Sequence, residues 1–182
     1  MLKNTETGYG AITKAFHWLL FLMIGFMIVG GNMIAAMPRG AEKFEAIGAH
    51  KSLGLLILAL ILFRLAWRLV NVRPKDPEGV SAIQNRIAHT AHWLLYGLML
   101  AQPLTGILMS QAAGYPVSFF GLFQLPALLG KNPPLAEFFH GAHGVVWVLL
   151  ALVVITHAGA ALYHHFVLKD DVLRRMGWGW NA

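Results

Sequence analysis

Residues 137–169 read EFFHGAHGVVWVLLALVVITHAGAALYHHFVLK. This apolar run is long enough to cross a membrane as a helix, which takes about 20 residues. His143 and His157 lie fourteen residues apart within it. On an α-helix, fourteen steps return to within about 40° of the starting direction after a rise of about 21 Å. We therefore expect both imidazoles to point the same way, near opposite faces of a membrane.

The composition of the whole chain is that of a membrane protein. Of 182 residues, 57% are hydrophobic and 12% are charged, against about 25% charged in soluble domains. The 14 Lys and Arg residues exceed the 8 Asp and Glu residues, but they flank apolar runs and form no polar stripe, so no nucleic-acid partner is expected. The chain has no cysteine, which excludes disulfides, iron–sulfur clusters and covalent haem attachment.

Four apolar stretches are long enough to span a bilayer. They cover residues 12–37, 47–70, 86–112 and 138–166. The first is longer than a signal-peptide core and is predicted to be a retained helix. The segment 113–136 is broken by prolines and is expected to lie along the membrane interface. The predicted fold is all-α, an integral membrane four-helix bundle formed by a single domain, residues 1–182.

The distribution of positive charge predicts the orientation of this bundle, because cytoplasmic loops are enriched in Lys and Arg. One side carries ten basic residues: Lys3, Lys14, Arg64, Arg68, Arg73, Lys75, Arg86, Lys169, Arg174 and Arg175. The other side carries four: Arg39, Lys43, Lys51 and Lys131. Both termini are therefore expected in the cytoplasm, and the protein is expected to be a multi-pass component of the bacterial inner membrane.

Histidines within membrane helices are costly, so their depth in the bundle is informative. Alternating helix directions place His50 and His143 near the outer end of the bundle. His157 lies near the inner end, and only the last helix supplies a histidine at both levels. His50 is therefore the expected partner of His143.

The inner level offers more than one partner for His157. His17 is preferred because it lies inside an apolar run. His89 and His92 remain alternatives, in the first turns after a polar loop. Two imidazoles from different helices would fill both axial positions of a haem iron, and such a closed site suits electron transfer. Two sites on one helix predict a path across the membrane, with metal centres about 20 Å apart by helix rise.

Arg64 follows His50 by fourteen residues, so it is expected on the same helix face at the inner level. A guanidinium at that depth needs an anion or acceptor, and haem propionates or a quinone carbonyl would serve. Snorkelling to the headgroups explains Arg68 better than Arg64. For His89, His140 and His165 taken singly, an interhelical hydrogen bond is the favoured interpretation.

Several motifs resemble the bacterial cytochrome b561 family of di-haem, quinone-linked membrane cytochromes. They are HW at His17, HKSLG from His50, RLAWRL from Arg64, AHTAHWLLYGLML from Ala88 and HAGAALYHHFVLKDDVLRRM from His157. The resemblance implies two non-covalent b haems, with His17, His50, His143 and His157 at the axial ligand positions.

Within that family the chain resembles the superoxide oxidases. That likeness implies electron transfer from periplasmic superoxide, through the outer haem, to ubiquinone at the inner haem. Basic residues at the outer end would attract the anion, although Glu42, Glu45 and Glu137 leave an outer net charge of 4 − 3 = +1. His164 or Arg64 could bind a quinone oxygen, and His164 could relay protons because imidazole titrates near neutrality.

Two other functions compete with this interpretation. The first is a cytochrome b subunit that passes electrons from a hydrogenase or dehydrogenase partner to quinone. The second, from another class, is a metal-ion transporter using paired membrane histidines. It is disfavoured because divalent-ion paths usually place Asp or Glu beside His, and the helix interiors here lack carboxylates.

Overall fold

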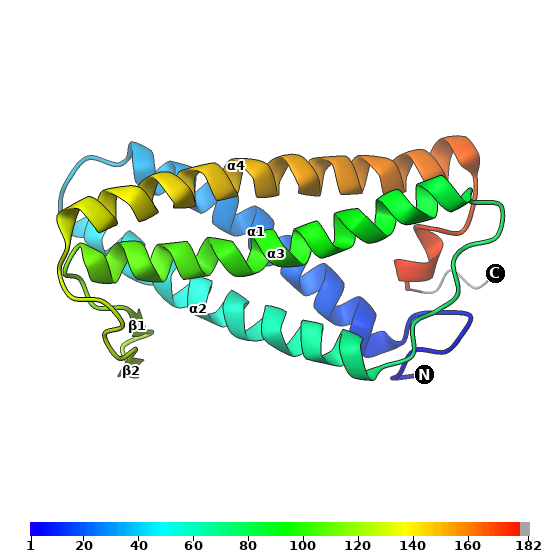
Figure 1. Ribbon diagram of the computed structural model, residues 1–182, viewed down its shortest axis with the longest axis horizontal. Coiled ribbons are helices and arrows are strands. Elements are labelled where there is room, and N and C mark those ends of the chain that lie inside the picture. The colour runs from blue at the N-terminus through cyan, green and yellow to red at the C-terminus, as the bar shows by residue number, and fades with distance from the viewer. Residues whose placement is uncertain (179–182) are drawn as a thin grey trace.

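The computed structural model describes residues 1–178 and shows four long helices (Figure 1). Each is long and apolar enough to cross a membrane. The helices are α1 (Ala11–Ala36), α2 (Ala41–Val70), α3 (Ala82–Ala112) and α4 (Pro133–Tyr163). Helix α4 continues into the π-helical turn η1 (His164–Leu168), and a short 3-10 turn, η2 (Arg174–Met176), follows. The predicted all-α membrane bundle is confirmed.

Three helices, α2, α3 and α4, begin several residues before the apolar stretches that predicted them, and polar side chains cap the last two. Ser81 Oγ accepts a hydrogen bond from Gln84 N–H, and Gln84 Oε1 accepts one from Ser81 N–H, which forms a capping box. Asn132 caps α4 with a single bond, which its Oδ1 accepts from Leu135 N–H. Pro133 and Pro134 were expected to break the helix, but they occupy its first turn, where a missing N–H costs nothing.

The segment between α3 and α4 contains a small β-hairpin that the sequence did not predict. Strand β1 (Ser118–Phe119) pairs antiparallel with β2 (Phe123–Gln124). In Figure 1 the hairpin lies at the end of the bundle opposite the N-terminus and η2. We call these the loop end and the termini end. The cytoplasmic placement of the termini end remains a prediction.

The helices do not all pack on one another. Helix α4 packs along α3, α3 also packs on α2, and α2 on α1, whereas α4 makes almost no close backbone contact with α1 or α2. A buried apolar cluster lies between the helices and consists of Leu20, Ile24, Ile57, Ile61, Leu95, Tyr96, Leu98, Met99 and Leu150. Many other large apolar side chains face outward, as expected of a bundle surrounded by lipid.

Candidate haem-binding site

His50 of α2 and His143 of α4 face each other near the loop end, and we call this pair the outer tier. Their ring centroids lie 6.5 Å apart, with an angle of 75° between the ring planes. Two imidazoles that bind one metal ion from opposite sides hold their centroids about 6 Å apart, because each metal–nitrogen bond is about 2 Å. The predicted pair therefore lies at a separation that suits a shared iron.

His17 of α1 and His157 of α4 face each other near the termini end, with centroids 6.2 Å apart and an interplanar angle of 69°. His92 of α3 is a third member of this inner tier, with its centroid 5.3 Å from that of His157. The separation between His17 and His157 resembles that of the outer pair. His92 is closer to His157 than a shared axial iron would require, so the geometry favours His17 as the partner.

A second set of contacts fixes the ring of His143. Its Nδ1 lies 3.0 Å from the backbone carbonyl oxygen of Gln102 and 3.1 Å from Thr105 Oγ1. The Thr105 hydroxyl itself donates to the same carbonyl oxygen at 2.8 Å. A carbonyl only accepts, so His143 carries its proton on Nδ1, and its Nε2 lone pair is the one that can accept or bind a ligand. Metal-binding histidines are usually oriented in this way.

The side-chain amide of Gln102 lies on the axial side of His143. Its nitrogen donates to His143 Nε2 at 3.0 Å, while its oxygen is buried and has no hydrogen-bond partner within residues 1–178. The buried Gln102 amide thus has only one of its two polar atoms hydrogen-bonded. It is a flexible side chain that lies where a ligand of His143 Nε2 would bind. An iron at Nε2 would displace that amide rather than any backbone.

Two glycines leave room for the outer imidazoles. A Cβ added to Gly31 of α1 would lie 3.3 Å from His50 Cε1, and one added to Gly106 of α3 would lie 3.1 Å from His143 Cε1. Any larger residue would press on the ring it faces. With α4 held apart from α1 and α2, the residues of the outer tier fit a flat group held between two imidazoles.

Arg64 reaches the inner tier, as its spacing from His50 predicts. Its Nη2 donates to His17 Nδ1 at 3.0 Å, because a guanidinium can only donate. Its guanidinium carbon also lies 5.8 Å from the ring centroid of Tyr96. Arg68 lies instead over Trp93 and Tyr96, at 5.4 and 5.6 Å. A positive charge is thus available where the propionates of an inner haem would need one.

His164 is held by a carboxylate that the sequence reasoning missed. Its Nδ1 lies 2.5 Å from Asp170 Oδ2, with the two side chains 15% and 16% exposed. Lys169 adopts a left-handed conformation (φ 59°) directly after η1 and turns the chain back onto the helix end. The charged run after His165 was visible in the sequence, but its contact with His164 depends on this turn. Arg64, the other residue predicted for a quinone site, bonds to His17 instead.

The remaining histidines lie outside both tiers. His89 contacts Asp76 of the loop before α3, with His89 Nε2 3.1 Å from Asp76 Oδ1, and it also contacts Arg73. It is thus part of a polar surface cluster and does not approach His157. His165 packs against Phe166 with centroids 4.8 Å apart, and His140 is exposed.

Residues 8–179 match the family described as prokaryotic cytochrome b561. The chain belongs to this family. It is 35% identical over 176 residues to cytochrome b561 homolog 2 of Escherichia coli K12, covering 95% of this chain and 93% of that protein. It is 30% identical over 168 residues to the probable superoxide oxidase CybB of Yersinia pestis, covering 92% and 94%. It is 31% identical over 176 residues to cytochrome b562 of Cereibacter sphaeroides, covering 94% and 96%.

Membership of the prokaryotic cytochrome b561 family settles the class of chemistry. The protein is a multi-pass membrane electron carrier of a haem b family. This class leaves the metal-ion transporter without support. Superoxide oxidation is named for only one of the three relatives described above. The electron donor therefore does not follow from family membership.

Proposed function

We propose that this cytochrome b561 protein carries electrons across the membrane from a periplasmic donor to ubiquinone. The outer tier would hold one haem b between His50 and His143, and the inner tier a second between His17 and His157. The observation that carries this proposal is the pair of facing imidazoles at each end of α4, at 6.5 and 6.2 Å. Haem b with both axial positions filled supplies one-electron transfer without an open site for oxygen.

The buried centre of the bundle supports a path between the tiers. Leu150 lies seven residues from His143 and seven from His157, and only 4% of it is exposed. The apolar cluster around it excludes water, so charge moving between the tiers would pass through packed side chains. Electrons, unlike ions, can cross such a barrier without a channel. This arrangement suits an electron carrier.

Superoxide is the donor we propose. The support is the likeness to the probable superoxide oxidase of Yersinia pestis, together with basic residues at the loop end. There, Lys43 Nζ donates to Met37 O at 2.9 Å and Lys51 Nζ donates to Pro116 O at 3.0 Å. These bonds hold both ammonium groups at the loop end, where they would attract an anion.

The ubiquinone site is proposed beside His164. The Nδ1–H of His164 donates to Asp170, which leaves His164 Nε2 to meet a quinone oxygen. Reducing a quinone to a quinol takes two electrons and two protons. The electrons would arrive one at a time from superoxide, each superoxide leaving as oxygen. A protonated His164 can give the Nε2 proton to the quinone oxygen and recover one from water, while Asp170 stabilises the charged ring. Arg64, which bonds to His17, would neutralise the propionates of the inner haem.

The deciding experiment is superoxide-dependent reduction of ubiquinone by the purified protein in liposomes. The parent chain should reduce ubiquinone as superoxide is consumed, and His143→Ala should stop this transfer. Purified protein that binds haem but is not reduced by superoxide would overturn the proposed donor. Co-purification with an iron–sulfur partner would then favour the hydrogenase or dehydrogenase subunit.

A further inference from the structure

Helix α4 supplies both tiers, yet its backbone makes almost no close contact with the helices that carry its partners. His50 lies on α2 and His17 on α1. Helix α4 packs on α3, α3 packs on α2, and α2 packs on α1, so α4 is connected to α2 and α1 only through the helices between them. Helix packing alone therefore fixes the distance between the two imidazoles of each pair only indirectly.

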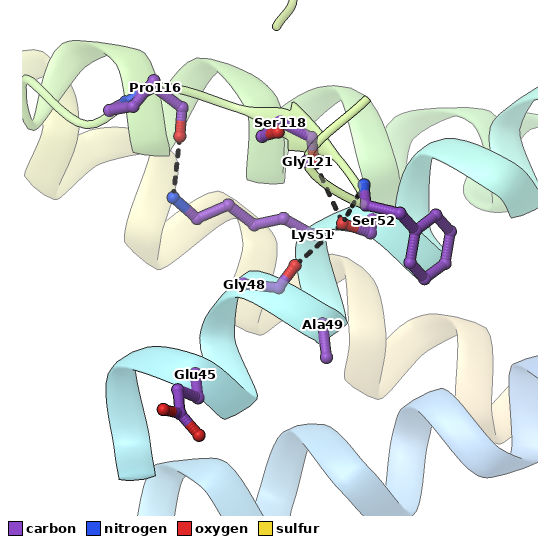
Figure 2. Close-up of a pocket in the computed structure, with 9 residues that line it drawn as sticks. Glu45, Gly48, Ala49, Lys51, Ser52, Pro116, Ser118 and Gly121 are labelled. Atoms are coloured by element: carbon purple, nitrogen blue, oxygen red, sulfur yellow. Dashed lines mark hydrogen bonds between the residues drawn. The ribbon is translucent and has the colours of Figure 1, made fainter. Parts of the chain in front are cut away.

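The segment that precedes α4 in the chain bonds to α2 at Lys51 and Ser52, the two residues that follow His50. We call residues 113–132 the outer strap. Ser52 Oγ accepts Phe120 N–H at 3.0 Å and lies 3.0 Å from the carbonyl oxygen of Ser118. Lys51 Nζ donates to Pro116 O at 3.0 Å. Figure 2 shows Lys51 and Ser52 reaching this segment from one turn of α2, around a recess of about 340 Å³.

Ser52 faces away from the outer tier, because two helical steps turn it about 200° from His50. The outer strap therefore presses on the back of the turn that presents His50 to His143. Its side of α2 is tightly packed, since Ser52 is only 4% exposed. The strap also constrains Phe120, whose φ of 47° is unusual for a bulky residue. The hydrogen bond that Phe120 N–H donates to Ser52 Oγ holds that residue in place.

The other attachment of the outer strap is to α3, the helix that packs along α4. Gln111 Nε2 donates to Pro126 O at 3.0 Å, and Gln111 Oε1 accepts Leu128 N–H at 2.9 Å. Ser110 Oγ donates to Tyr115 O at 3.3 Å. The buried polar side chains within residues 1–178 are Ser52, Ser110 and Gln111. All three fasten this one segment, which joins α2 to the α3–α4 pair at the outer tier.

A segment after α4 makes the equivalent connection at the other end. We call residues 170–178 the inner strap. Trp18 Nε1 donates to Met176 O at 2.8 Å, and Lys14 Nζ donates to Gly177 O at 2.8 Å. Trp18 directly follows His17, and the two rings are in edge contact at 5.3 Å. The inner strap thus ties the chain leaving α4 to the turn of α1 that presents His17.

We propose that the two straps are positioning devices, each setting the separation of one histidine pair independently of the other. Ser52 and Trp18 are the positioning residues, because each bonds to a strap from one or two positions after a ligand histidine. This inference rests on the proposed haem pairs. It explains why segments on both sides of α4 bond to the residues one and two positions after a ligand.

The test compares Ser52→Ala with Trp18→Phe in the purified, haem-loaded protein. His50→Ala first identifies the outer haem by its loss. Ser52→Ala should shift the midpoint potential and low-spin EPR signal of the outer haem alone and weaken its retention about tenfold, as loss of a buried hydrogen bond would. Trp18→Phe should do the same to the inner haem alone. Ser52→Thr, which keeps the hydroxyl, should retain both parent signals.

Two matched variants sharpen the comparison. Trp67→Phe removes an indole bond to Thr13 that joins α2 to α1 without either strap, so both haem signals should persist. Lys51→Met removes the bond to Pro116 and keeps Ser52, and it should give a smaller shift of the outer haem. If the Ser52→Ala protein does not accumulate, the shift of the outer haem in Lys51→Met tests the outer strap instead.

The outcomes separate this inference from the proposed function. The proposed role of the straps would be wrong if both haems were unchanged in Ser52→Ala and in Trp18→Phe. It would also be wrong if either variant disturbed both haems equally. Neither result would contradict the proposed function. A parent protein with fewer than two haems would overturn the histidine pairs and the straps together.

Discussion

Gly106 of α3 lies directly against the imidazole of His143: a Cβ at position 106 would be 3.1 Å from His143 Cε1. Real Cβ contacts are rarely this short, so Gly106→Ala would force the ring to turn. The bonds from His143 Nδ1 to Gln102 and Thr105 limit how far it can turn. We expect Gly106→Ala to broaden or shift the EPR signal of the outer haem.

The control for this change lies nine residues earlier on the same helix. A Cβ at Gly97 would meet nothing within 4 Å, so Gly97→Ala should leave both haem signals in place. Gly31→Ala, at 3.3 Å from His50 Cε1, should reproduce the Gly106→Ala effect from the other side. If Gly97→Ala and Gly106→Ala behaved alike, the close contact would have no bearing on the outer site.

Replacing either α4 ligand should remove one haem only. His143→Ala leaves His50 alone at the outer tier, and His157→Ala leaves His17 without its partner at the inner tier. A haem with one axial imidazole is held less tightly and loses its low-spin spectrum. Haem-to-protein ratios from pyridine haemochrome assays should fall from two to one in each variant. Loss of the same haem in both variants would contradict the assignment of the two depths.

The hydroxyl of Thr105 should help to retain the outer haem through His143, without itself binding the iron. Thr105 Oγ1 is 3.1 Å from His143 Nδ1 and donates to the Gln102 carbonyl that orients the ring. Thr105→Val keeps the shape and removes this hydroxyl. Loss of such an outer partner lowers affinity about tenfold or more, so the outer haem should dissociate faster in competition with apomyoglobin. The inner haem, far from Thr105, serves as the internal control.

Asp170→Asn should separate quinone reduction from haem reduction. The change removes the negative charge that His164 Nδ1 meets at 2.5 Å and keeps a similar shape. Superoxide should still reduce both haems, while electrons would pass to ubiquinone at least tenfold more slowly because His164 loses its charge-stabilising partner. His164→Ala should show the same split. Unchanged quinone reduction in His164→Ala, with intact haem spectra, would remove His164 from the site.

Much of this architecture could be predicted because its signals are local. Hydropathy marks four helices, and the spacing of His143 and His157 places them on one face of α4 whatever the rest of the chain does. The proximity of His50 and His143 could be predicted from the depth of each histidine in the membrane. What escaped prediction depends on contacts between distant segments. The meeting of His164 with Asp170 needs the left-handed turn at Lys169. The role of Ser52 needs a hairpin whose strands are two residues long, too short to show a pattern.

The partner of His157 is where two histidines compete most closely, and one pair of variants decides between them. His17 lies 6.2 Å from His157 between centroids, and His92 lies 5.3 Å away. Only the first separation leaves room for an iron with two bonds of about 2 Å. His17→Ala should therefore abolish the inner haem. His92→Ala should keep it, with a shifted potential because a polar ring beside His157 is lost. If His92→Ala removed the inner haem and His17→Ala retained it, α3 would supply the ligand. Arg64 would then bond to a histidine that binds no iron.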